Sequence, residues 1–195
     1  MDIDVWEVID AAKTKPYGFT AFYPGPGLGG HCIPLDPYYL SWKAREYGFH
    51  TTMIEASMTV NDGMPEWCAS RAARILNNHG KAANGAKILV LGVAYKQDID
   101  DYRESPALRL VDRMERRGCK VDYFDSWVPV YKYKGQTKKS IPKLTADILE
   151  EADLVVIACA HTDVDYDFVQ KHAKAVFDTK NAMKNVKERD NIEVL

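Results

Sequence analysis

Two short, uninterrupted runs of apolar residues constrain the fold of this 195-residue chain more than any other feature. Residues 87–92 read Lys-Ile-Leu-Val-Leu-Gly, and residues 154–158 read Leu-Val-Val-Ile-Ala. A strand without a polar side must be buried on both faces, as in a parallel sheet that helices cover. Both runs are far shorter than the ~20 apolar residues that cross a membrane as a helix. We therefore predict an α/β domain, no membrane-spanning segment and no membrane partner.

The chain around these runs alternates between strand and helix patterns. Pro106 lies in the first turn of a helix in which Leu108, Val111 and Met114 share one face. Further elements are expected in the same alternation: strands at 120–124 and 175–178, the latter being the last, and helices at 105–117, 145–151 and 166–173. This order is typical of βαβ units in a doubly wound parallel sheet. Residues 126–144 interrupt it and fit either an exposed loop or a hairpin.

The first 82 residues follow a different plan, with helices and one glycine-rich loop. Residues 23–32 hold four glycines and two prolines in ten positions, which excludes a helix or a strand interior. Helices are expected at 2–13, 38–47 and 53–79, and the last has two apolar faces. A helix of that kind joins two domains or forms a subunit interface. With a boundary at residues 80–86, we predict two domains, at 1–82 and 83–195.

Charge and targeting signals exclude several classes of function. Lys and Arg number 26 against 28 Asp and Glu, so the net charge is -2 and no basic surface attracts nucleic acid. The opening residues Met-Asp-Ile-Asp lack the basic and apolar regions of a signal peptide, so a cytoplasmic location is expected. The four cysteines form no Cys-x-x-Cys pair and the five histidines show no ligand spacing, which argues against a metal site or a disulfide framework.

Cys32 is the first candidate for chemistry because it ends the glycine-rich loop shortly before the helix expected at 38–47. Backbone amides of such a loop can approach a ligand closely, and a nearby helix N-terminus lowers the pKa of a thiol. Two interpretations of Cys32 are open: a reactive nucleophile, or a buried structural cysteine. The neighbouring His31 fits a modulator of that thiol or an exposed loop residue. The other three cysteines lie within regular elements and are expected in the core.

A second candidate site follows the first strand, at the sheet edge where α/β domains bind ligands. Lys96 and Arg103 lie in this crossover, where each side chain fits a phosphate or sugar contact or an ion pair with a neighbouring aspartate. The crossover lacks the Gly-x-Gly-x-x-Gly fingerprint of dinucleotide sites. Asp125 ends the next strand, which is the position of a ribose-binding acid in nucleotide folds. Without the glycines, nothing else in the sequence supports that role for Asp125.

Two longer motifs resemble one known family. Residues 25–37, Gly-Pro-Gly-Leu-Gly-Gly-His-Cys-Ile-Pro-Leu-Asp-Pro, resemble the catalytic-cysteine loop of the UDP-glucose/GDP-mannose dehydrogenase family. Residues 92–96, Gly-Val-Ala-Tyr-Lys, and residues 101–106, Asp-Tyr-Arg-Glu-Ser-Pro, resemble its C-terminal UDP-binding domain. The resemblance implies a helical central segment, used for dimerisation, followed by a Rossmann-like parallel-sheet domain that binds UDP. The long helix at 53–79 would be the dimerisation helix, so a homodimer is expected.

The resemblance also implies a reaction. Members of the family oxidise the C6 alcohol of a nucleotide sugar to a carboxylate in two hydride transfers to NAD. Cys32 would capture the intermediate aldehyde as a thiohemiacetal, which is oxidised to a thioester and hydrolysed. Asp36 would orient or activate the hydrolytic water.

Binding residues follow from the same resemblance. The positions assigned to the UDP-sugar lie in the glycine-rich loop, after the first strand and after the strand at 175–178, and fall here on Tyr23, Gly25, Gly27, Gly29, Gly30, Tyr95, Lys96 and Lys180. Lys180 stands where the family usually has an arginine, so the charge is kept but the bidentate fork is lost. Arg103 matches a position that reaches the NAD cofactor.

Leu35 favours one branch of the family. Dehydrogenases of UDP-glucose tend to carry a lysine at this position, and the surrounding residues are more similar to dehydrogenases of UDP-N-acetylhexosamines. The family's N-terminal NAD-binding Rossmann domain has no counterpart in the chain, which resembles the C-terminal half and is expected to have negligible activity alone. Three alternatives remain: a UDP-glucose or GDP-mannose dehydrogenase, a non-catalytic nucleotide-sugar-binding or oligomerisation module, and an unrelated α/β domain.

Overall fold

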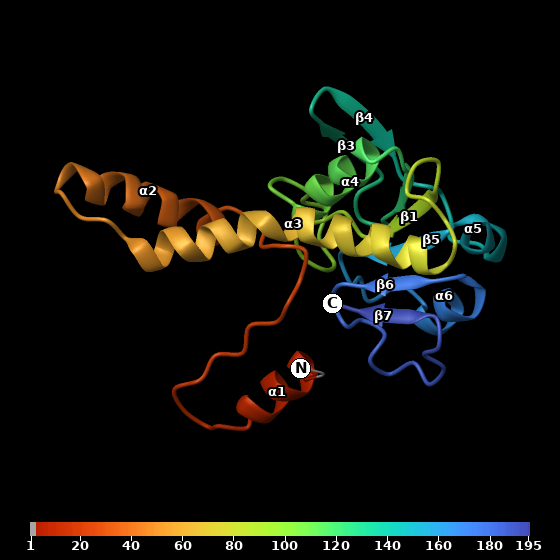
Figure 1. The fold of residues 1–195 in the computed structure, drawn as a ribbon, viewed down its shortest axis with the longest axis horizontal. Helices are drawn as coiled ribbons and strands as arrows, with labels where there is room; N and C mark the ends of the chain where they lie inside the picture. Colours follow the sequence, from red (N-terminus) through yellow and green to blue (C-terminus); the bar gives the residue numbers. More distant parts are fainter. Residues whose placement is uncertain (1–2) are drawn as a thin grey trace.

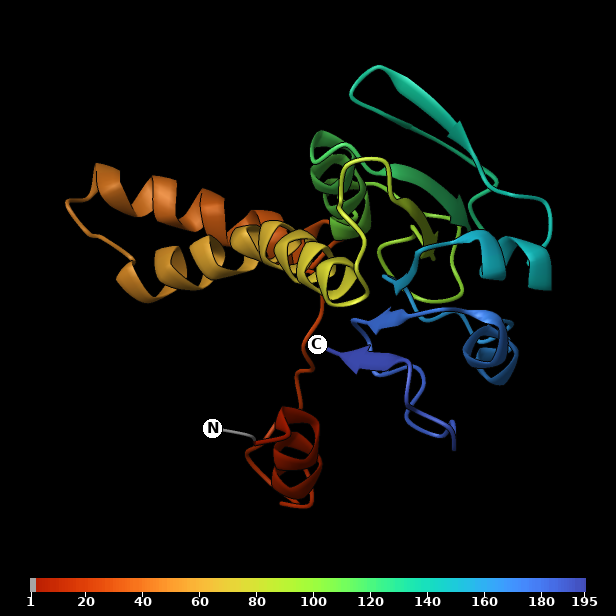
Figure 2. The same cartoon turned by 45° about the vertical axis from the view of Figure 1, so that its right-hand side comes forward.

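The computed structural model describes residues 3–195 and has two parts of different architecture (Figure 1). The C-terminal part is an α/β body built on a five-stranded sheet. The N-terminal part consists of a long helical hairpin and a short helix, α1 (Val5–Ala12), set apart at the end of an extended segment (Figures 1 and 2). Within residues 3–195, no helix is both long and apolar enough to span a membrane.

The sheet is parallel throughout, and its strands run in the order β2-β1-β5-β6-β7. The strands are β1 (Lys87–Leu91), β2 (Lys120–Phe124), β5 (Leu154–Ile157), β6 (Val176–Asp178) and β7 (Ile192–Val194). The first four confirm the strands predicted from the sequence. The prediction that residues 175–178 form the last strand is wrong, because β7 pairs with β6 at the edge of the sheet. A strand of three residues with a central glutamate has no apolar run by which to recognise it.

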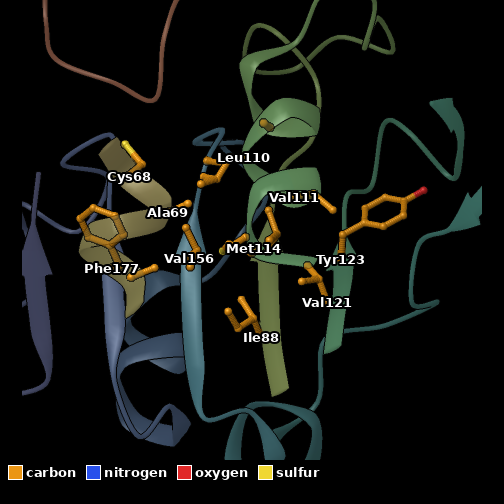
Figure 3. Packing of buried hydrophobic residues seen from close by; sticks show 14 of the residues in the cluster. Cys68, Ala69, Ile88, Leu110, Val111, Met114, Val121, Tyr123, Val156 and Phe177 are labelled. Carbon is orange, nitrogen blue, oxygen red and sulfur yellow. The ribbon is translucent and has the colours of Figure 1, made fainter. Parts of the chain in front are cut away.

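Helices cover both faces of the sheet, as strands without a polar side require. The helices are α3 (Thr52–Asn78), α4 (Pro106–Arg116), α5 (Ala146–Glu151) and α6 (Tyr166–His172). α4 and the second half of α3 pack over Ile88, Val156 and Phe177 (Figure 3). α5 and α6 pack on the opposite face, over Leu89 and Val155. The α/β fold class predicted from the sequence is confirmed.

Side-chain caps determine where the helices of the body begin. The Ser105 Oγ accepts a hydrogen bond from the Ala107 N–H at 3.2 Å, and Pro106 takes the first helical position, where no N–H is needed. Thr145 and Asp165 cap α5 and α6 in the same way. Each cap therefore fixes the residue at which its helix begins.

Residues 126–144 adopt the hairpin rather than the loop alternative. β3 (Val130–Tyr133) pairs antiparallel with β4 (Gln136–Lys139). Lys134 and Gly135 connect them with φ values of 48° and 79°, the left-handed pair that suits the twist of a two-residue hairpin turn. The ring of Tyr131 lies 4.9 Å from that of Tyr123 and anchors the hairpin to the body.

The helical hairpin consists of α2 (Cys32–Glu46) and α3. The prediction that the first of these helices starts at residue 38 is wrong, because α2 begins at Cys32 and continues through Pro34 and Pro37. Pro34 lies in the first turn, where no N–H takes part in the helix, and Pro37 forfeits one intrahelical hydrogen bond. The predicted end is confirmed, since Gly48 closes the helix with a φ of 72°.

α3 is one continuous helix of 27 residues and confirms the long helix predicted from the sequence. Its first half pairs with α2, and its second half buries Cys68, Ala72 and Leu76 against the body. Arg109 on α4 adds an ion pair to Asp62 at 3.0 Å. The two apolar faces of α3 therefore serve two different contacts within one chain.

α1 lies against the C-terminal end of the chain. Asp4 caps its first turn by accepting a 2.8 Å hydrogen bond from the Trp6 N–H. The indole Nε1 of Trp6 donates to the Leu195 carbonyl at 3.2 Å, and its ring stacks on Tyr23 at a centroid distance of 5.6 Å. The helix expected at 2–13 is therefore present, with Asp2 outside the described residues. This packing brings the start of the glycine-rich loop close to the edge strand β7.

Candidate functional site

The glycine-rich loop packs directly on the segment that follows β1. A Cβ on Gly29 would lie 2.6 Å from the Tyr95 Cβ and 2.9 Å from the Glu104 carbonyl oxygen, so no larger residue fits at Gly29. Gly30 has a φ of 91°, and a Cβ there would lie 3.1 Å from the Tyr95 ring. The two motifs identified in the sequence are thus in contact in the fold.

α3 holds the same loop from another side. The Asn61 Oδ1 accepts a 2.8 Å hydrogen bond from the Leu28 N–H. Gly27 has a φ of 125°, and a Cβ there would lie 3.1 Å from the Pro106 Cβ at the start of α4. Gly27 therefore needs to be glycine for its conformation as well as for space.

Cys32 is exposed at the first position of α2. The interpretation of Cys32 as a buried structural cysteine is therefore wrong. Its thiol lies at a helix N-terminus, where unpaired backbone N–H groups favour negative charge, and His31 at the N-cap makes no side-chain cap bond. Asp36 follows one turn later and is also exposed. Both line a groove of about 760 Å³ between α2 and α3.

The other three cysteines are buried, as predicted. Burial raises the pKa of Cys68 and of Cys159 to about 12, and it raises the pKa of Cys119 as well. These thiols stay protonated at neutral pH. Cys32 is therefore the thiol available for nucleophilic chemistry.

Lys180 lies on the loop after β6 and reaches the start of the glycine-rich loop. A Cβ on Gly25 would lie 2.6 Å from the Lys180 Nζ. Burial lowers the pKa of the Lys180 amine, and no carboxylate within residues 3–195 forms an ion pair with it. Lys180, Lys184 and the stacked pair of Trp6 and Tyr23 line a pocket of about 290 Å³. The carboxylate of Asp10 also lines this pocket, where it forms an ion pair of 2.6 Å with another lysine. The two remaining amines suit an anion that carries a planar group.

The two cations after β1 differ in their surroundings. Arg103 makes a bidentate contact with Asp101, Nε to Oδ1 at 3.0 Å and Nη2 to Oδ2 at 2.8 Å. These hydrogen bonds lower the pKa of Asp101 to about 2. Lys96 is exposed, and it forms no ion pair with any carboxylate in the described part of the chain. The ion-pair interpretation therefore describes Arg103 but is wrong for Lys96.

Asp125 does not present its carboxylate to a ribose. The side chain is buried, and its Oδ2 accepts hydrogen bonds from the Val93 and Ala94 N–H groups at 2.7 and 3.1 Å. The Oδ1 accepts from Trp127 and Val128 N–H groups, both at 2.9 Å. Burial alone would raise the pKa of Asp125, but its hydrogen bonds outweigh burial and lower that pKa. The carboxylate is an internal anchor for the ends of β1 and β2.

His161 also belongs to this anchor, and sequence reasoning did not single it out. Its Nε2 lies 3.0 Å from the Asp125 Oδ2, and the residue is almost completely buried. The available signal was its position shortly after the apolar strand β5, at the ligand-binding edge of the sheet. Within residues 3–195, no three His, Cys, Asp or Glu side chains converge into a candidate metal site.

Comparison with protein families matches both parts of the chain. The UDP-glucose/GDP-mannose dehydrogenase family, UDP binding domain, matches residues 89–185, and the central domain of the same family matches residues 1–63. The chain belongs to this family. The resemblance noted in the sequence is confirmed, and the match to the UDP binding domain lies on the α/β body that carries Tyr95 and Lys96.

Relatives within the family include dehydrogenases of UDP-N-acetylhexosamines. The chain is 34% identical over 167 residues to a UDP-N-acetyl-D-glucosamine 6-dehydrogenase of Pseudomonas aeruginosa, covering 84% of the chain and 38% of that protein. It is 30% identical over 190 residues to a UDP-N-acetyl-D-mannosamine dehydrogenase of Methanocaldococcus jannaschii, covering 93% and 40%. The structure of a UDP-D-ManNAc dehydrogenase from Pyrococcus horikoshii is similar with a TM-score of 0.82 at 29% identity, covering 98% and 44%. The 195-residue chain therefore spans less than half the length of each of these relatives.

Proposed function

We propose that residues 1–195 form the substrate-binding half of an NAD-dependent dehydrogenase, which oxidises the C6 alcohol of a UDP-N-acetylhexosamine to a uronate. One observation carries this proposal: the loop that ends in the exposed Cys32 packs through Gly29 and Gly30 on Tyr95 of the α/β body. A nucleophile and a nucleotide-binding sheet edge are thereby held together, as a reaction on the sugar of a UDP-sugar requires. The names of the relatives and Leu35 support the N-acetylhexosamine class.

Cations and aromatic rings supply the binding groups in this proposal. The amines of Lys96 and Lys180 have no carboxylate partner in the described structure and would neutralise the diphosphate. Tyr23, the first residue of the loop, and Tyr95, on which the loop packs, offer aromatic rings and hydroxyl groups. The loop itself brings its backbone close to the substrate through Gly25, Gly27, Gly29 and Gly30.

Cys32 and Asp36 would carry the chemistry on α2. The Sγ of Cys32 adds to the C6 carbonyl of an aldehyde and forms the C–S bond of a thiohemiacetal. Once this carbon is at the oxidation level of a thioester, water cleaves the bond. Asp36 takes a proton from that water, and Cys32 leaves as a thiolate at the N-terminus of α2, where negative charge is stabilised.

NAD is the hydride acceptor in this proposal, but the α/β body does not fit a dinucleotide at its own sheet edge. The segment after β1 lacks the glycine fingerprint, and both oxygens of Asp125 already accept hydrogen bonds from the protein. We therefore propose that NAD binds to a domain outside residues 1–195. Arg103, on the rim of the body, would reach the cofactor from this chain.

A homodimer is also part of the proposal, with residues 1–82 as the dimerisation domain and residues 83–195 as the UDP-binding domain. Large apolar side chains on the helical hairpin are uncovered: Trp42 is 65% exposed, Tyr47 80%, Phe49 64% and Met53 82%. An exposed apolar surface of this kind on one continuous element indicates a protein contact. A second copy of the hairpin would cover it.

Calorimetric titration with UDP-N-acetylglucosamine tests the binding half of the proposal. We expect saturable binding that weakens about tenfold in Lys96→Ala, since one charge-assisted contact contributes about 1.5 kcal/mol. The matched control is Lys120→Ala, an exposed lysine at the opposite end of the sheet. Tighter binding of UDP-glucose or GDP-mannose would contradict the N-acetylhexosamine assignment, and no binding of any of the three would contradict the proposal itself.

A further inference from the structure

The sheet has one topological switch point, between β1 and β5. The chain leaves β1 toward β2 on one side, and later returns to place β5 on the other side. Ligands of α/β sheets bind at the carboxyl ends of the strands that flank such a point. The segment after β1 carries Tyr95 and Lys96, and the segment after β5 carries His161 and Thr162. The contacts between these two segments therefore determine the positions of Tyr95 and Lys96 at this edge of the sheet.

His161 joins them through its two ring nitrogens. Its Nδ1 accepts a 2.9 Å hydrogen bond from the Asp98 N–H, and its Nε2 lies 3.0 Å from the Asp125 Oδ2. Because a backbone N–H can only donate, Nδ1 must be bare and the ring proton is on Nε2. The imidazole thus makes one bond to the loop after β1 and a different bond to the buried anchor.

Asp98 is held in a conformation that needs such support. Its φ is 60°, in the left-handed region that costs a non-glycine residue about 1 kcal/mol or more. Its carboxylate accepts hydrogen bonds from the Thr162 N–H at 2.9 Å and from the Thr162 Oγ1 at 3.0 Å. Together, the contacts of Asp98 with His161 and Thr162 form a clasp between the two segments.

The clasp lies two residues from Lys96 and three from Tyr95, the residue on which the glycine-rich loop packs. The Tyr95 N–H donates to the Asp101 carbonyl at 3.0 Å, so the segment between them is a closed turn with Asp98 in its middle. We propose that His161 is a positioning residue, which holds this turn through Nδ1 so that Tyr95 and Lys96 meet the nucleotide sugar. This inference rests on the proposed function and adds to it a residue that does not touch the substrate.

Two conservative variants separate the two bonds of the ring. In His161→Asn, the amide oxygen takes roughly the place of Nδ1 and can accept from the Asp98 N–H, but the contact with Asp125 is lost. In His161→Gln, the amide nitrogen takes roughly the place of Nε2 and keeps the Asp125 contact, but the Asp98 N–H loses its acceptor. A positioning role predicts that Asn rescues function better than Gln, whereas a purely structural role through Asp125 predicts the reverse.

Ligand binding and amide hydrogen exchange distinguish these two roles. We expect His161→Gln to weaken the binding of UDP-N-acetylglucosamine about tenfold and to speed amide hydrogen exchange in residues 94–101. We expect His161→Asn to stay within about threefold of the parent chain in both. The matched control is His172→Gln. His172 lies on α6, away from the clasp, and its Nδ1 is 2.9 Å from the Glu150 Oε1. Equal effects of the two His161 variants, or a larger effect of Asn, would overturn the proposal.

A milder variant covers the case in which both His161 variants unfold. Thr162→Val removes only the Oγ1 bond to Asp98, and we expect faster exchange in residues 94–101 and about threefold weaker binding. Unchanged exchange in that segment would overturn the clasp. The exchange measurement needs no ligand, so it tests the clasp even if the parent chain binds no UDP-sugar, an outcome that would contradict the proposed function instead.

Discussion

Gly29 and Tyr95 approach so closely that a Cβ on Gly29 would lie 2.6 Å from the Tyr95 Cβ. The backbone of the cysteine-bearing loop therefore rests on the UDP-binding domain at a point where only glycine fits. We predict that Gly29→Ala pushes the loop away from Tyr95 and weakens the binding of UDP-N-acetylglucosamine at least about tenfold. Isothermal titration of the folded variant measures this loss.

Gly63→Ala is the control for that substitution. Gly63 lies inside α3, and no atom of residues 3–195 would lie within 4 Å of a Cβ there, so we expect alanine to stabilise the helix and to leave binding unchanged. Parent-like affinity in Gly29→Ala would show that the loop and Tyr95 do not form one site.

Cys32 is expected to be the single thiol that reacts in the native protein. It is exposed, whereas burial holds the pKa of Cys68 and of Cys159 at about 12. Treatment with iodoacetamide at pH 8 followed by peptide mass spectrometry should give one adduct, on Cys32, and none in Cys32→Ser. Labelling spread over all four cysteines of the native protein would contradict the assignment.

We expect Lys180 to lower the stability of the fold while it strengthens the binding of the UDP-sugar. Its amine is half-buried and has no carboxylate partner among residues 3–195, so desolvation penalises the charged form and lowers its pKa. We predict that Lys180→Met raises Tm by about 2 °C at pH 7 and weakens UDP-sugar binding. Because the folded-state pKa lies below the ordinary value of 10.5, the penalty shrinks as pH rises toward 10.5, and so should the gain in Tm.

The exposed Lys184, in the same pocket, supplies the control for Lys180. Lys184→Met should leave Tm unchanged at every pH, because its amine is already in water. A fall in Tm for Lys180→Met, with binding unchanged, would make Lys180 a structural residue.

Continuous apolar runs predicted the central strands, because burial on both faces leaves no polar side chain to obscure the pattern. β7 escaped prediction because its pairing with β6 depends on the fold and not on its own three residues. The start of α2 was misplaced because Pro34 and Pro37 indicate a loop, although Pro34 lies in the first turn, where it is tolerated, and Pro37 removes only one intrahelical hydrogen bond.

The candidate site was predictable only in part, for a similar reason. Cys32 and the glycines are adjacent in sequence and were found as a motif. The roles of Asp125 and His161 depend on which strand ends meet at the switch point, and a sequence without its sheet order does not contain that information. The sequence around Asp125 suggests a ribose ligand because it does not show that the carboxylate is already occupied. Its backbone donors, Val93 and Val128 among them, come from two separate segments that only the fold brings together.

Asp125 is expected to support the fold rather than contact substrate directly. Asp125→Asn replaces one acceptor oxygen with an amide that faces backbone donors, and we predict a loss of about 2 kcal/mol, or about 4–8 °C in Tm, at pH 7. Because the pKa of Asp125 is lowered by folding, this stabilisation is present above the ordinary value of 3.8 and fades as pH falls below it. Asp122→Asn, at an exposed site on β2, is the control. A parent-like Tm with lost binding would restore the ribose hypothesis.

Trp42 offers a direct test of the proposed homodimer. Its side chain is 65% exposed on α2, among the other uncovered rings of the helical hairpin. A glutamate in a dimer interface would lose hydration without gaining a partner, so we predict that Trp42→Glu converts a dimer into a monomer in size-exclusion chromatography with light scattering. Trp127→Glu is the matched control, since Trp127 is 43% exposed but lies on the α/β body, where a charge should leave the dimer intact. A concentration of about 100 μM is well above the Kd of a stable dimer. If the parent chain is monomeric at that concentration, a second copy does not cover this surface and the homodimer proposal is wrong.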